Sequence, residues 1–228
     1  MAESEELDQW FPRPPESLEA QRLGIVVGGS LSKGLEVKLD PQTVIEGLAV
    51  GRYVVIHGRT GRRFFSIVND VVLDVTNPLI EKTPPDVSDP FIARVHQGTS
   101  TFGRIHVAPM LVLESFPSSS STMEGKEREP QPVKTIPGHF SPVYEASPED
   151  VALVFGDERQ PGYFAIGEPL DMAGIPVPIN LSRFVERSAG VFGKTGTGKT
   201  FLTRLLLAGL IRQRIAVNLV FDMHNEYG

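Results

Sequence analysis

The sequence predicts a mixed fold, in which a small N-terminal β-barrel is followed by the beginning of an α/β domain with a parallel sheet. Three observations support this prediction. Short apolar segments separated by glycines dominate residues 22–150, and this pattern is typical of small barrels. A glycine-rich loop occupies residues 193–200. An apolar segment precedes that loop, and a helical pattern and a second apolar segment follow it.

Composition narrows the class of protein. The chain has 228 residues, of which 40% are hydrophobic and 22% charged, and these are ordinary values for globular domains. The net charge of −6 argues against a protein covered with basic side chains, although a local basic stripe for nucleic acid remains compatible with it. The absence of cysteine excludes disulfides and thiolate metal sites. The N-terminus does not resemble a signal peptide, and no apolar stretch reaches the ~20 residues that span a bilayer. We therefore expect a soluble, cytoplasmic protein without a membrane partner.

The barrel is expected within residues 22–150, after a flexible leader, residues 1–21, that is acidic and rich in proline. Residues 117–132 are dominated by serine, proline and charge, which predicts a disordered loop. Gly58-Arg59-Thr60-Gly61 predicts a hairpin turn. The expected strands are residues 24–28, 35–39, 53–57, 64–68, 71–75, 91–95 and 110–114.

The second domain is expected within residues 151–228. Ser147, followed by Glu149 and Asp150, predicts that a helix starts just before this domain. Further along, residues 188–192 and 216–221 predict two parallel strands, and residues 200–212 predict the helix between them.

The glycine-rich loop, Gly193-Lys194-Thr195-Gly196-Thr197-Gly198-Lys199-Thr200, is a complete match to the G-x-x-x-x-G-K-[ST] phosphate loop, or Walker A motif. In such a loop the backbone N–H groups surround the phosphates of a nucleoside triphosphate. Lys199 is expected to reach the outer phosphates, and the Thr200 hydroxyl to bind Mg²⁺. The alternative is a flexible turn between two core elements, and the order strand, loop, helix, strand argues against it. The predicted ligand-binding residues are Gly193, Thr195, Gly196, Thr197, Gly198, Lys199, Thr200 and Phe201.

A family resemblance rests on this loop and on three further segments: Ile166-Gly167-Glu168, Val177–Phe184 and Phe221–Tyr227. With the predicted barrel before them, they resemble the HerA-type ATPases of the HerA–FtsK group of DNA-translocating motors. The barrel resembles the HAS-barrel that these proteins share with the subunits of rotary ATP synthases. Members commonly carry Asp-Pro-His-Gly-Glu-Tyr after the second strand, whereas this chain has Met223 for the proline and Asn225 for the glycine.

The resemblance implies catalytic roles for Lys199, Asp222 and Glu226. The two carboxylates would lie near Mg²⁺ or the attacking water. The alternative for Asp222 is a residue that merely caps the turn at the end of a strand. Arg183 and Arg187 could reach the nucleotide of a neighbouring subunit or lie on a solvated surface.

At the level of the whole protein, the resemblance implies a homohexamer that binds ATP and Mg²⁺ and translocates double-stranded DNA, with a NurA-like nuclease as partner in DNA end processing or repair. Further parallel strands and an arginine finger would be needed for turnover. We therefore expect this sequence to be the N-terminal piece of a longer protein, and leave open whether the chain is itself an enzyme. The alternative function is a nucleotide-binding assembly or docking module without turnover. A GTPase is disfavoured, because no Asn-Lys-x-Asp segment occurs.

Overall fold

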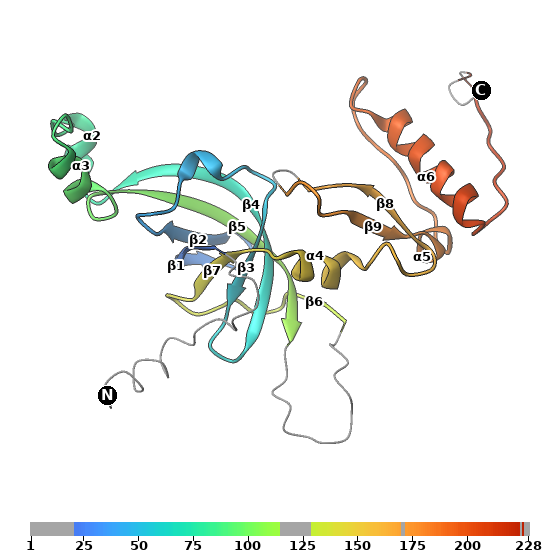
Figure 1. Cartoon of the computed structure of the whole chain (residues 1–228), viewed down its shortest axis with the longest axis horizontal. Coiled ribbons are helices and arrows are strands. Elements are labelled where there is room, and N and C mark those ends of the chain that lie inside the picture. The colour runs from blue at the N-terminus through green and yellow to red at the C-terminus, as the bar shows by residue number, and fades with distance from the viewer. Residues whose placement is uncertain (1–20, 115–128, 170–171, 224, 226–228) are drawn as a thin grey trace. The chain divides into compact units, whose positions relative to one another are not determined.

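The computed structural model describes residues 21–114, 129–169, 172–223 and 225. It divides into two compact units, Met1–Ser147 and Pro148–Gly228 (Figure 1). The predicted leader, apart from residue 21, and residues 117–128 of the predicted loop lie outside the described residues. Within the described ranges, no helix is long and apolar enough to cross a membrane.

The first unit is a closed antiparallel barrel of six strands, which confirms the predicted barrel (Figure 1). The sheet runs in the order β2-β1-β7-β3-β4-β5, and pairing of β2 with β5 closes it. The strands of the closed barrel are β1 (Arg22–Ser30), β2 (Gly34–Leu39), β3 (Tyr53–His57), β4 (Arg62–Val75), β5 (Thr101–Glu114) and β7 (Pro142–Glu145). A short 3-10 helix, η1 (Ile45–Gly47), follows β2.

The barrel core follows from residue alternation along its strands. In β2, Leu35, Val37 and Leu39 are buried while the residues between them are only partly covered. Successive side chains of a strand point to opposite faces, so one apolar set fills the interior of a small barrel. The same cluster takes in residues from β3, β5 and β7, among them Ile56, Ile105 and Val143.

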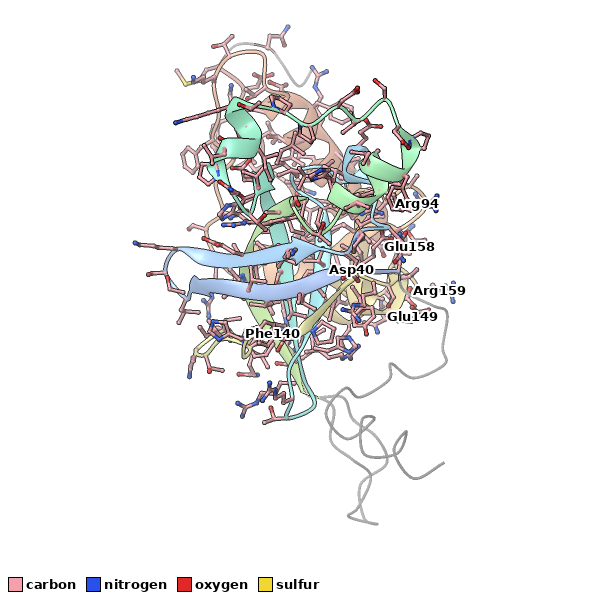
Figure 2. All side chains as sticks on the ribbon, turned by 90° about the vertical axis from the view of Figure 1, so that its left-hand side faces the viewer. Asp40, Arg94, Phe140, Glu149, Glu158 and Arg159 are labelled. Atoms are coloured by element: carbon pink, nitrogen blue, oxygen red, sulfur yellow. The ribbon has the colours of Figure 1, made fainter. Side chains whose placement is uncertain are left out.

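An ion pair and two hydrogen bonds to one backbone carbonyl fix the end of the β1–β2 pair. Asp40, labelled in Figure 2, lies just after β2 and pairs with Arg22 at 3.0 Å. The Asp40 N–H donates to the Leu23 carbonyl at 2.8 Å, and the Thr43 hydroxyl donates to the same carbonyl at 2.9 Å. These contacts hold the first strand of the barrel to the chain that leaves the second.

Two predicted strands, residues 64–68 and 71–75, are one continuous strand, β4, which pairs with β5 along its length. The register shifts between Val68 and Asp70, so a β-bulge takes up the polar residues Asn69 and Asp70 that separate the two predicted strands. A second correction concerns β6 (Gln131–Pro132), which pairs with Leu111 and Val112 although it lies in the loop predicted to be disordered.

The strand predicted over residues 91–95 is wrong, because these residues form the helix α3 (Pro90–His96). Asp89 caps it by accepting the Phe91 N–H at 2.8 Å, and Pro90 occupies the first turn. The apolar side chains of Phe91 and Val95 are spaced for a helix and are largely exposed. Another short helix, α2 (Pro78–Lys82), precedes it.

The second unit contains two antiparallel strands and three helices in its described part (Figure 1). The helix predicted at Ser147 is present as α4 (Pro148–Phe155), and the helix predicted over 200–212 is present as α6. Leu181, Leu206 and Leu210 form a buried cluster that joins α6 to α5 and to the hairpin. The elements are β8 (Tyr163–Gly167), β9 (Val177–Asn180), α5 (Leu181–Val185) and α6 (Lys199–Gln213), besides α4.

The predicted parallel sheet is not found among the described residues. The described sheet of this unit, β8–β9, is antiparallel, and residues 188–192 and 216–221 are irregular. A strand exists only where a neighbouring strand pairs with its backbone, and an apolar run does not supply that neighbour. Val217 is fully exposed and Phe221 is 87% exposed, as expected of apolar residues without a covering layer.

Two glycines of β1 give opposite predictions for stability. An added Cβ at Gly24 would collide with the Lys38 carbonyl oxygen and lie 2.9 Å from the Leu39 Cα, both backbone atoms of β2. We expect Gly24→Ala to destabilise the barrel by about 1–3 kcal/mol, because backbone cannot move aside as a side-chain end can. Urea unfolding followed by far-ultraviolet circular dichroism measures the change.

Gly28→Ala is the matched control. Its Cβ would meet only a side-chain oxygen of Glu36, at 3.8 Å. We expect this variant to be as stable as the wild type or slightly more stable, because alanine restricts the unfolded chain. An equal loss of stability in both variants would contradict the prediction, because it would show that the clash with the β2 backbone is not the cause of the loss at Gly24.

Candidate phosphate-binding site

The predicted phosphate loop forms a tight curl that leads directly into α6. The Thr197 N–H donates to the Lys194 carbonyl at 3.3 Å, which closes a four-residue turn. Gly196, the third residue of that turn, has a φ of 83°, and Gly198, which precedes α6, has a φ of 84°. Both angles lie in the left-handed region that favours glycine, so the two glycines are required by the path of the chain.

The Lys194 carbonyl oxygen is the centre of the curl. It accepts the Thr197 hydroxyl at 2.7 Å and the Lys199 ammonium at 2.7 Å, in addition to the longer turn hydrogen bond. An ammonium has three N–H donors, so this bond leaves two donors of Lys199 for other acceptors. The lysine of the motif, Lys199, is therefore oriented by the backbone of its own loop.

The first turn of α6 supplies further donors. The Leu202 N–H is bonded to the Gly198 carbonyl at 2.9 Å, as the first step of the helical ladder. The N–H groups of Lys199 and Phe201 precede that step, at the end of the helix where an α-helix offers no intrahelical acceptors to its N–H groups. Together with the helix dipole, such groups attract an anion.

The surface beside two glycines of the loop is open. An added Cβ at Gly196 or Gly198 would meet nothing within 4 Å, so the surface beside these glycines is open. At Gly193, in contrast, a Cβ would lie 2.6 Å from the Thr197 hydroxyl oxygen. Gly193 thus allows the curl to close, and the other two glycines keep its outer side clear for an approaching ligand.

The loop is exposed, whereas the helix behind it is anchored. Residues 193–198 are all exposed. One face of α6 packs through Leu206 and Leu210, and the Phe164 ring of β8 lies so close to Gly209 that a Cβ there would approach within 2.7 Å of the ring. The start of the helix, and with it the loop, is thereby held at a fixed place in the unit.

The structure brings the predicted ligand-binding residues from Gly193 to Phe201 into this one curl. The Phe201 side chain is 72% exposed, so its contribution would come from the backbone N–H. Asp222 is partly buried in the irregular segment after α6. Glu226 lies outside the described residues. The roles of all these residues as ligands stay predictions.

Metal binding would depend on few protein groups. The described residues contain no group of three or more His, Cys, Asp or Glu side chains that could hold a metal ion. The motif itself offers Mg²⁺ the Thr200 hydroxyl, and phosphates and water are oxygen ligands usual for this ion.

Sequence reasoning did not find two features. One is the role of the Lys194 carbonyl and the Thr197 hydroxyl, because the motif leaves both positions open. The other is a pocket of about 600 Å³ in the barrel unit, between η1, the end of β4 and the helices α2 and α3. Its lining, mostly apolar, includes Leu39, Ile45, Ile80, Ala93 and Phe102. In the sequence, the helices beside this pocket are indicated by Asn77 and Asp89, which are capping residues that each precede a proline.

Comparison with known proteins finds similarity in the part of the chain that contains the phosphate loop. Residues 164–228 match the family model described as "Helicase HerA, central domain". The chain is also 33% identical over 86 residues to a protein of Methanocaldococcus jannaschii named "Probable helicase MJ1565". That alignment covers 38% of this chain and 16% of the relative, so the chain spans about one sixth of the length of the relative it matches.

Both matches agree with the resemblance drawn from the phosphate loop and the segments around it. The matched family segment begins in β8, contains the whole curl and extends past α6. The resemblance to the HerA-type ATPases is therefore confirmed, and it rests on residues 164–228, which are similar to the central domain of HerA helicases.

Proposed function

We propose that this chain carries the ATP-binding part of a HerA-like hexameric motor that translocates double-stranded DNA in DNA end processing or repair. The observation that carries the proposal is the curl at residues 193–198, which presents the Lys199 ammonium and the first N–H groups of α6 at one exposed place. The family match over the same residues supports it.

In this proposal each part of the curl has a separate task. The N–H groups from Thr195 to Phe201 surround the inner phosphates of ATP, and Lys199 directs its two remaining donors to the outer phosphates. The Thr200 hydroxyl holds Mg²⁺, which neutralises charge on the outer phosphates. Asp222 and Glu226 orient the ion or the attacking water. Arginines such as Arg187, which is exposed, are candidates for contact with the nucleotide of a neighbouring subunit.

The partners are proposed from the family. The relative in Methanocaldococcus jannaschii is named a helicase, which supports nucleic acid as the substrate of the whole protein. We propose double-stranded DNA in the channel of a homohexamer, and a NurA-like nuclease as the partner. The barrel, a HAS-barrel in this proposal, would supply the surface for ring assembly or nuclease docking.

A second candidate function is a nucleotide-binding assembly or docking module without ATP turnover. The observation that favours it is the difference in regularity between the chain that forms the curl and α6 and the chain that leads to Asp222. The curl and α6 are regular, whereas residues 216–221 before Asp222 are irregular. Such a chain would bind ATP without positioning a water for attack.

One prediction of the proposed function concerns Lys199. We expect Lys199→Ala to weaken the binding of a fluorescent ATP analogue with Mg²⁺ by at least about tenfold, because a charge-assisted contact to the phosphates is lost. The circular dichroism spectrum and the thermal midpoint should stay unchanged, since the side chain bonds only to an exposed loop. Unchanged affinity in this variant would contradict the phosphate-loop assignment.

A second prediction of the proposed function separates the two candidates. Phosphate release from ATP is measured for the whole protein, alone and with double-stranded DNA, because the proposal assigns only the ATP-binding part to this chain. Turnover that requires Lys199 and rises with DNA is expected of the motor, because its chemistry is coupled to DNA. Lys199-dependent binding of ATP without turnover, with or without DNA, is expected of the docking module.

A further inference from the structure

We propose that Thr197 is a positioning residue, whose hydroxyl holds the Lys194 carbonyl at the place where this carbonyl orients the Lys199 ammonium toward bound phosphates. This inference rests on the proposed function, because it concerns the same nucleotide site. The motif requires no particular side chain at position 197.

The contacts at the carbonyl carry the inference. The Lys194 oxygen accepts the Thr197 hydroxyl and the Lys199 ammonium at 2.7 Å each, and the Thr197 N–H only at 3.3 Å. A carbonyl oxygen has two lone pairs, and the two short bonds occupy them. Of the two hydrogen bonds by which Thr197 closes the turn, the one from its hydroxyl is the shorter. This hydroxyl and the Lys199 ammonium share one acceptor, the Lys194 carbonyl oxygen.

The loop has little else to hold this carbonyl in place. Residues 193–198 are exposed, and Gly196 and Gly198 have no Cβ to restrict their backbone dihedral angles. A lysine side chain also loses much rotamer freedom when it is ordered. A carbonyl fixed before the ligand arrives reduces this loss, since it holds one donor of Lys199 and leaves the others for phosphate.

The identity of the residue suits this task. Threonine is β-branched and has few χ1 rotamers, so its hydroxyl is held more firmly than that of serine. Gly193 lies directly against that hydroxyl, because a Cβ on Gly193 would be 2.6 Å from the Thr197 oxygen. Glycine, the smallest residue, therefore occupies the position beside the hydroxyl, where any side chain would clash with it.

The test compares variants of the whole chain by competition of ATP, with Mg²⁺, against a fluorescent ATP analogue. Thr197→Val keeps the shape and removes the donor, and we expect about tenfold weaker binding. Thr197→Ser keeps the donor and should bind within about threefold of the wild type. Thr203→Val is the control, because its hydroxyl bonds to the Lys199 carbonyl within the helix and should leave the affinity unchanged.

A double-mutant cycle distinguishes positioning from direct contact with the nucleotide. If Thr197 acts through Lys199, then Thr197→Val has little further effect in the Lys199→Ala background. An equal loss in both backgrounds would overturn the inference, because the hydroxyl would then act independently of the lysine.

Two other outcomes are also decisive. Binding by Thr197→Val that equals or exceeds that of the wild type would overturn the inference while leaving the proposed function standing. A wild-type chain that binds no nucleotide would overturn the proposed function and the inference with it. Matching thermal midpoints of all variants show that the differences arise in the loop and not in folding.

Discussion

The packing of one face of α6 against the β8–β9 hairpin is the contact on which the candidate site depends. Leu206 and Leu210 bury themselves against Leu181, and the Phe164 ring fills the space left by Gly209. Burial of such side chains contributes about 1.5–3 kcal/mol each, which is far more than the loop can contribute from its exposed residues. The curl therefore precedes a helix whose position is determined by its own packing in the unit.

This arrangement reconciles two requirements of a phosphate site. The ligand must reach the backbone, so the loop has to be exposed and rich in glycine, and such a segment loses much entropy when it is ordered. Order comes instead from the helix behind the loop and from hydrogen bonds to one carbonyl, that of Lys194. Little apolar surface has to be placed beside the phosphates, and the N–H groups stay available to them.

The features that the sequence predicted correctly are those encoded by neighbouring residues. Alternation in residues such as Leu35 and Val37 indicates a strand in one face of a barrel, and the phosphate-loop motif locates the curl and the helix after it. The errors arise where strand pairing or helix capping determines the secondary structure. Residues 91–95 have apolar content suited to a strand, but Asp89 and Pro90 begin a helix there. The shared acceptor at Lys194 could not be predicted, because a motif specifies side chains and not the direction of a carbonyl.

The irregular segment 216–221 shows why binding and turnover can separate in this fold. Its apolar residues are exposed, as is Phe192 before the loop, so neither segment supports the curl through a sheet. The described geometry of the curl is nonetheless complete, because it depends on α6, on the β8–β9 hairpin and on the bonds within the loop. In the proposed function, phosphate binding needs only local structure, whereas attack on the phosphate needs carboxylates held at a fixed distance from it. The order of Asp222 relative to Lys199, rather than the loop itself, would then decide whether the site turns over ATP.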